Sequence, residues 1–206
     1  MAENALITLG HEASAEFTEK KSVFIGHAAP VRTAEEAEAF VMKIKKQYAD
    51  ARHNVSAYMA GGAVRYSDDG EPKGTGGLPV LEVLKKSGVD GAVVVVTRYF
   101  GGILLGAPGL VRAYSKAASM AVEAAGIVTY ERYVECVIDC DYGSYDRLSY
   151  EIGRRNIIVD GTDFGSGVTL RLAVLASEYD AFRAAVDAMT NGRLAPVRGG
   201  DRFDAR

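Results

Sequence analysis

The alternation of apolar and polar positions is clearest between residues 91 and 126. Residues 93–96 are four consecutive valines, which suits a strand buried on both faces. From residue 110 to 125, apolar residues recur at the spacing of one wide helix face. Pro108 fits the first turn of this helix, and Gly126 fits a left-handed cap at its end. We therefore predict a buried strand, a glycine-rich turn and a long helix, with anion-attracting N–H groups at the helix start.

The same pattern predicts the elements that precede this strand. Strands are expected at residues 5–9, 22–28, 54–60 and 63–66, the last two joined by a Gly-Gly hairpin. One helix should begin after Thr33, which forms a capping box with Glu36. A shorter helix should run from Pro79 to Gly88. The segment between hairpin and helix, residues 67–77, is polar and rich in glycine, which predicts a loop.

A second unit begins near Tyr130. Its predicted strands and helices occupy residues 132–140, 144–153, 156–160, 167–176, 177–189 and 193–198, and the residues that follow should fray. This βαββαβ order is that of a ferredoxin-like sandwich. We therefore predict an α+β protein with two domains, residues 1–130 and 131–206.

Composition narrows the class of protein. Of 206 residues, 48% are hydrophobic and 25% charged, as in soluble globular proteins. There is no apolar run long enough to span a bilayer and no signal-peptide pattern at the start, so we expect a cytoplasmic protein without a membrane partner. A net charge of -3 means that nucleic-acid binding would need a local basic patch. Cys136 and Cys140, four apart on one predicted strand, cannot form a disulfide with each other and are expected to be buried.

Three polar stretches contain the candidate binding residues. They are His53 and Asn54 in the first, Asp68, Asp69 and Glu71 in the second, and Arg98, Tyr99, Phe100, Gly101, Gly102, Gly106, Arg112 and Lys116 in the third. The three carboxylates are compatible with a divalent cation, but Asp-Asp-Gly-Glu-Pro is also ordinary turn chemistry. We favour a turn with a role in recognition, and assign no metal, cofactor or catalytic residue.

The glycine-rich stretch lacks the spacing of a phosphate-binding P-loop. It is compatible either with a tight strand-to-helix connection or with an anion cradle flanked by Arg98, Arg112 and Lys116. Tyr99 and Phe100 are equally compatible with base stacking and with core packing. His53 is typical of a hydrogen-bonding loop residue, with a catalytic base as the alternative.

Together, the motifs His-Asn at 53–54, Ser-Asp-Asp-Gly-Glu-Pro at 67–72 and Arg-Tyr-Phe-Gly-Gly at 98–102 resemble the IMPACT family, specifically its bacterial YigZ-like branch. The resemblance covers almost the whole chain and is strongest from Lys21 to Ala118. It implies an N-terminal domain similar to ribosomal protein S5 domain 2 and a ferredoxin-like C-terminal domain. Eukaryotic members of the family regulate translation under nutrient stress.

The resemblance implies a non-enzymatic binding protein linked to the regulation of translation. Its partner would be RNA, the ribosome or a translation-associated protein. The sequence favours binding over catalysis, because no nucleophile–base pair is evident while arginines, aromatics and glycines are clustered. The alternative is a hydrolase for a small phosphate- or peptide-type substrate, using His53 and the carboxylates of residues 68–71.

Overall fold

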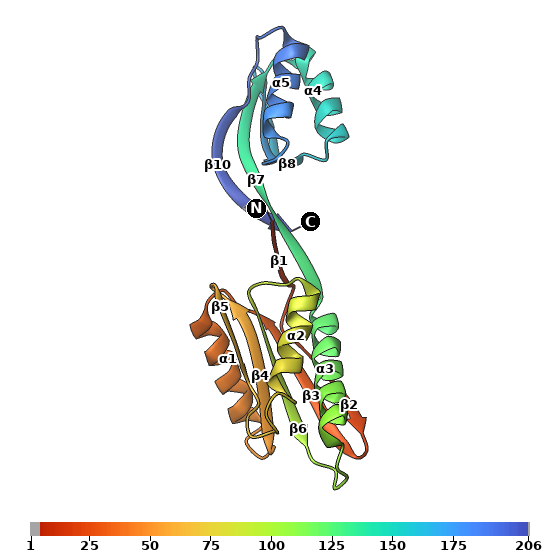
Figure 1. Ribbon diagram of the computed structural model, residues 1–206. Coiled ribbons are helices and arrows are strands. Elements are labelled where there is room, and N and C mark those ends of the chain that lie inside the picture. Colours follow the sequence, from red (N-terminus) through yellow and green to blue (C-terminus); the bar gives the residue numbers. More distant parts are fainter. Residues whose placement is uncertain (1–4, 206) are drawn as a thin grey trace. The chain divides into compact units, whose positions relative to one another are not determined.

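The computed structural model describes residues 5–205, which form an α+β chain with two antiparallel sheets (Figure 1). Residues Leu6–Thr129 make one compact unit, and the residues from Tyr130 onward make another together with Ala5. The described part of the chain contains no helix of sufficient length and apolarity to cross a membrane. The two antiparallel sheets and their helices confirm the predicted α+β class.

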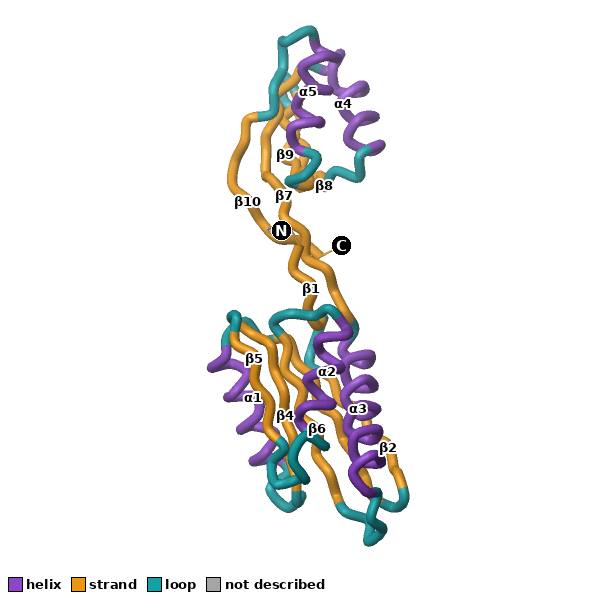
Figure 2. Tube along the Cα trace, in the orientation of Figure 1, coloured by secondary structure: helices purple, strands orange, loops and turns teal. Residues whose placement is uncertain are grey.

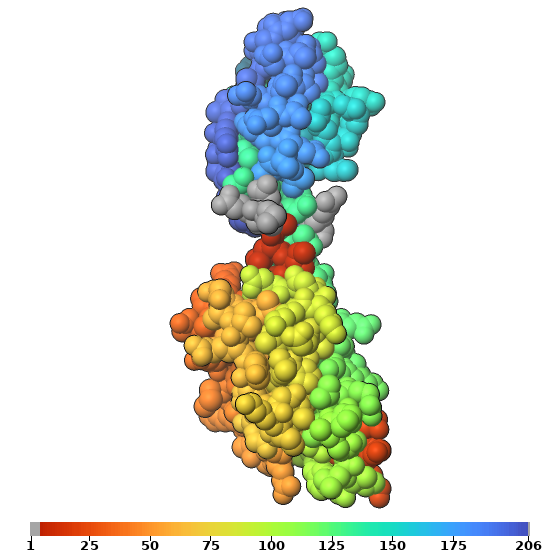
Figure 3. Space-filling view, in the orientation of Figure 1, coloured from red at the N-terminus to blue at the C-terminus, as the bar shows by residue number. Residues whose placement is uncertain are grey.

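The N-terminal unit is built on a five-stranded sheet in the order β2-β3-β6-β4-β5. Its strands are β2 (Ala13–Glu19), β3 (Ser22–Pro30), β4 (His53–Ala60), β5 (Ala63–Ser67) and β6 (Ala92–Tyr99). Its helices are α1 (Ala34–Gln47), α2 (Gly77–Ser87) and α3 (Gly106–Ala125). The helices α2 and α3 pack side by side on one face of the sheet, and α1 packs on the other. The residues of α2 and α3 form adjacent yellow and green surfaces in Figure 3.

The central strand β6 is buried on both faces, as its run of valines predicted. Val94 and Val96 pack in the core beneath α2 and α3, whereas Val93 and Val95 pack against α1. All four are fully buried. A strand between two helical layers needs apolar residues at every position, because successive side chains point to opposite faces.

The second unit has the element order that the sequence predicted. Its elements are β7 (Ile127–Cys140), α4 (Tyr142–Arg154), β8 (Ile158–Phe164), β9 (Val168–Leu175), α5 (Tyr179–Thr190) and β10 (Val197–Ala205). In its sheet, β9 lies between β7 and β8, and both β10 and β1 (Ala5–Leu9) pair with β7. Cys136 and Cys140 are buried free thiols, as expected.

Two strand predictions were wrong. The strand β2 was missed, because its alternation is mostly polar and only Phe17 contributes a large apolar side chain. The last strand was placed at 193–198 and the following residues were expected to fray, yet β10 pairs with β7 from Val197 to Ala205. Its apolar signal is weak, and Arg202 is instead held by Asp160 at 2.8 Å and Asp204 at 2.6 Å.

The contact between β3 and α3 depends on the absence of a side chain at Gly26. A Cβ there would lie 2.4 Å from the carbonyl oxygen of Ala117 and 2.9 Å from the Cβ of Ala121. We expect Gly26→Ala to lower the free energy of unfolding by about 1–3 kcal/mol, because helix or strand must shift. Urea denaturation measures this effect.

Gly153→Ala is the matched control for that substitution. Gly153 lies in α4, and an added Cβ would meet no atom of the described residues within 4 Å. There alanine should raise stability by up to about 1 kcal/mol, because it is the better helix former. Equal effects of the two substitutions would contradict the close-approach argument.

Candidate functional site

The N-terminal unit gathers the three polar stretches at one end of its sheet. The loops α1–β4, β5–α2 and β6–α3 lie at this end together with the β2–β3 turn (Figure 2). We call these segments, residues 20–21, 48–52, 68–76 and 100–105, the loop end. Because strands β4 and β6 are antiparallel neighbours, the start of one lies beside the end of the other, which pairs His53 with Arg98.

Beneath the loop end lies a buried cluster of charged and polar side chains. Arg98 Nη1 donates to Glu71 Oε1 at 2.6 Å, and the Tyr114 hydroxyl donates to the same oxygen at 2.7 Å. The Arg98 and Glu71 side chains are only 7% and 3% exposed. Burial, followed by the hydrogen bond to Glu71, raises the pKa of Tyr114. Tyr114 lies on the predicted apolar helix face, and no local signal marked it as a partner of Glu71.

The position of Arg98 corrects the anion-cradle hypothesis. Its guanidinium is 5.5 Å from the ring centroids of Phe24 and Phe100, and its Nε has no hydrogen-bond partner within residues 5–205. Since its charge is matched by buried Glu71, Arg98 is not a free cation on the surface of the glycine-rich turn. Its ion pair with Glu71 instead holds the β5–α2 loop against β6.

The carboxylates of Asp68 and Asp69 stabilise the β5–α2 loop. Asp68 accepts backbone hydrogen bonds from Gly74, Gly76 and Gly77 at 2.8–3.1 Å, at the start of α2. Although burial opposes them, these bonds hold the pKa of Asp68 below its usual value. Asp69 accepts from the backbone N–H of Asn54 and pairs with Lys45, both at 2.6 Å. This arrangement supports the turn interpretation.

His53, Asn54 and Tyr99 are also held by internal contacts. His53 Nδ1 lies 2.8 Å from the Asp69 carbonyl oxygen, and its Nε2 lies 3.9 Å from Glu71 Oε1. A carbonyl oxygen only accepts hydrogen bonds, so Nδ1 carries the proton. Asn54 Oδ1 accepts from Thr97 at 2.7 Å, and the Tyr99 hydroxyl donates to Asp50 at 2.9 Å.

The glycine-rich turn is a tight connection that packs on the β2–β3 turn. A Cβ at Gly101 would lie 2.0 Å from the carbonyl carbon of Lys21, so no other residue fits there. Gly102 and Gly106 have φ values of +86° and +72°, in the left-handed region that favours glycine. No side chain of the described residues caps the start of α3 at Gly106. Phe100, which directly precedes the glycine-rich turn, is 43% exposed.

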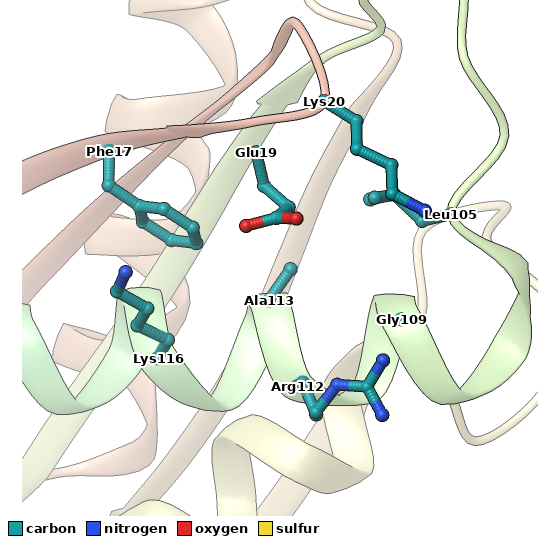
Figure 4. A pocket seen from close by; sticks show the side chains of 8 residues that line it. All are labelled: Phe17, Glu19, Lys20, Leu105, Gly109, Arg112, Ala113 and Lys116. Carbon is teal, nitrogen blue, oxygen red and sulfur yellow. The ribbon is translucent and has the colours of Figure 1, made fainter.

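Arg112 and Lys116 lie on the outer side of α3 and line a separate pocket. The pocket holds about 260 Å³ and is bounded on the other side by the end of β2 (Figure 4). Its lining residues are Phe17, Glu19, Lys20, Leu105, Gly109, Arg112, Ala113 and Lys116. Glu19 and Lys20 were not among the sequence candidates, because β2, which ends at Glu19, was not predicted.

The exposed charge at the loop end and on the adjoining helix turns is mainly positive. Seven exposed basic side chains there make no ion pair within the described residues: Lys20, Lys21, Lys46, Arg52, Lys73, Arg112 and Lys116. The exposed carboxylates in the same segments are Glu19 and Asp50. The chain as a whole is acidic, so this concentration of unmatched cations is local.

Comparison with protein-family models finds two matches. Residues 20–122 match the Impact N-terminal domain, and residues 138–193 match a domain of unknown function, DUF1949. The first match contains all three polar stretches. The second lies within the second unit.

Individual proteins and a solved structure match over most of the chain. The chain is 37% identical to the IMPACT family member YvyE of Bacillus subtilis, covering 92% of this chain and 89% of the relative. It is 35% identical to YigZ of Escherichia coli, covering 85% and 88% respectively. The mouse protein IMPACT is 35% identical over 43% of this chain and 30% of its own length. A crystal structure of a hypothetical protein matches with a TM-score of 0.61 and 31% identity, covering 96% of this chain and 98% of the other.

Proposed function

The chain belongs to the IMPACT family, and from that premise we propose that it is a non-enzymatic binding protein linked to the regulation of translation. Its partner is RNA, free or within the ribosome, contacted through the loop end. The observation that carries the proposal is the set of seven exposed basic side chains without ion-pair partners in the described residues. Such unmatched cations bind phosphates by releasing condensed counterions.

The proposal includes a fold and a location. We assign residues 1–130 to a ribosomal protein S5 domain 2-like domain and residues 131–206 to a ferredoxin-like domain. The sheet order β10-β7-β9-β8 with the βαββαβ sequence of elements supports the second assignment. A role in translation would place the protein in the cytoplasm.

The internal contacts described above suit a recognition surface. The cap formed by Asp68 and the ion pair of Glu71 with Arg98 fix the backbone of the β5–α2 loop before any partner binds. Pre-organised loops lose little conformational entropy on binding. Exposed Phe100 offers a ring face on which an unpaired base can stack.

We expect Lys73→Ala and Arg112→Ala each to weaken RNA or ribosome binding about tenfold at 0.1 M salt, since each removes one phosphate contact. The slope of log affinity against log salt should be about -2 to -4 for two to four contacts, and one unit shallower in each variant. Ribosome co-sedimentation and filter binding over a salt series measure both quantities.

Lys86→Ala is the matched control for these variants. Lys86 is an exposed lysine in the last turn of α2, at the opposite end of that helix from the β5–α2 loop. Its removal should leave affinity and salt slope unchanged. The proposal is wrong if the parent protein binds neither ribosomes nor RNA, or if all three variants bind as the parent does.

The alternative, a hydrolase built on His53 and the carboxylates of residues 68–71, has less support. Asp68 and Asp69 already accept backbone hydrogen bonds. Glu71 is the carboxylate that faces His53, and it is shared with Arg98 and Tyr114. Metal-dependent turnover of nucleotides, phosphoesters or peptides that is lost in both His53→Ala and Asp69→Asn would nevertheless favour the hydrolase.

A further inference from the structure

The pocket between β2 and α3 combines a flat aromatic wall with an excess of positive charge. Phe17 stacks on Phe24 with ring centroids 5.4 Å apart, which holds the Phe17 ring in place. On the facing side, α3 contributes the small residues Gly109 and Ala113, which fill little of the space. The pocket has a volume of about 260 Å³ (Figure 4). A pocket with one flat wall and small residues opposite accepts a planar ring.

Three basic side chains and one acid supply the polar groups of this pocket. Lys20, Arg112 and Lys116 line it together with Glu19, and none of the four has an ion-pair partner among the described residues. Lys116 Nζ lies 4.4 Å from the centroid of the Phe17 ring. Because Lys116 is exposed and its chain is flexible, it can move aside and remain close enough to pair with a phosphate. The pocket thus suits a ring that carries phosphate.

Glu19 identifies which ring fits best. Phe17 and Glu19 are two residues apart on β2, so their side chains lie on the same face of the sheet, about 7 Å apart along the strand. A base stacked on Phe17 therefore turns one edge toward the Glu19 carboxylate. An ionised carboxylate only accepts hydrogen bonds, so that edge must offer donors.

Among the four RNA bases, guanine alone presents two adjacent N–H donors, at N1 and N2, on its Watson–Crick edge. Adenine and cytosine place an acceptor nitrogen beside their amino group, and uracil places carbonyl oxygens on both sides of its single N–H. An acceptor facing the carboxylate is repelled and loses its own hydrogen bond. We propose that this pocket holds one unpaired guanosine nucleotide of the bound RNA, with the base on Phe17, its edge on Glu19 and its phosphates near Lys20 and Arg112.

This inference rests on the proposed function, and its test separates the two. Labelled hexaribonucleotides UUUUUU and UUGUUU are titrated with the full chain, and fluorescence anisotropy reports both affinities. We expect the guanosine-containing strand to bind about tenfold tighter, the discrimination of one bidentate base contact. Glu19→Gln should bring the two affinities within about twofold of each other, because an amide presents both an acceptor and donors.

Two further variants complete the experiment. Glu16→Gln changes an exposed acid on the same strand, one that does not line the pocket, and should leave the preference intact. Phe17→Leu keeps an apolar side chain against the core while it removes the flat wall, and should also remove the preference. Equal binding of both strands by the parent would overturn the guanosine site and leave the proposed function standing, whereas failure of both strands and of ribosomes to bind would refute both.

Discussion

Glu71→Ala is expected to destabilise the N-terminal unit by about 3–5 kcal/mol, the cost of leaving a buried charge without its partner. Arg98 is 7% exposed at its side chain and has Glu71 as its ion-pair partner, so the substitution leaves the guanidinium without a counter-charge inside the protein. Tyr114 loses its hydrogen-bond acceptor at the same time. Urea denaturation followed by circular dichroism measures the loss in the free energy of unfolding.

Two companion variants isolate the cause of this loss. Tyr114→Phe removes one hydrogen bond but no charge, and should cost only about 1 kcal/mol. Glu71→Leu combined with Arg98→Met removes both charges, and should recover much of the stability lost in Glu71→Ala, because replacement of a whole buried ion pair by apolar residues is often close to neutral. A loss below about 1 kcal/mol in Glu71→Ala would contradict the buried ion pair.

The second large effect is expected on acidification, through His27. This side chain is 3% exposed on β3, where Nδ1 lies 2.8 Å from Ser14 Oγ and the ring lies 4.8 Å from the ring of Tyr48. Burial lowers the pKa of His27 from 6.5 to about 4; Glu12 partly opposes this and Lys43 adds to it. Between pH 6.5 and about 4, His27 therefore binds a proton in the unfolded chain but not in the folded chain.

The free energy of unfolding should consequently fall as the pH drops from about 6.5 to about 4. Below about pH 4, His27 should cause no further loss. A pKa difference of this size corresponds to about 3 kcal/mol. His27→Gln removes the titrating group, so its stability should fall less over the same range than that of the parent. Parallel stability curves for the two proteins between pH 7 and pH 4 would contradict this role of His27.

Local signals in the sequence were sufficient for the elements that depend on short-range physics. Four consecutive valines predicted that β6 is buried on both faces, and the apolar spacing predicted α3. At the start of α1, Thr33 accepts a hydrogen bond from the backbone N–H of Glu36, while the Glu36 side chain accepts one from the backbone of Arg32. Periodicity and caps act within a few residues, so they can be seen without the fold.

The candidate residues were found in the sequence, but their roles depended on partners far along the chain. Nothing near Arg98 indicated that it would form an ion pair with Glu71, 27 positions earlier, or that Tyr114 would donate to the same carboxylate oxygen. The sequence interpretation therefore left open an anion cradle flanked by Arg98. Only the strand register and the packing of α3 show that this arginine is buried.

The sequence by itself determined the class of fold, the order of most elements and the residues that carry polar chemistry, because these follow from local periodicity, caps and turn residues. The tertiary structure decided the strands with weak apolar patterns, β2 and β10, whose formation depends on a neighbouring strand. It also decided which charges are matched inside the protein and which are left at the surface. Whether two charges are matched depends on their distance in space. The separation of two residues along the chain does not reveal that their side chains meet at 2.6 Å.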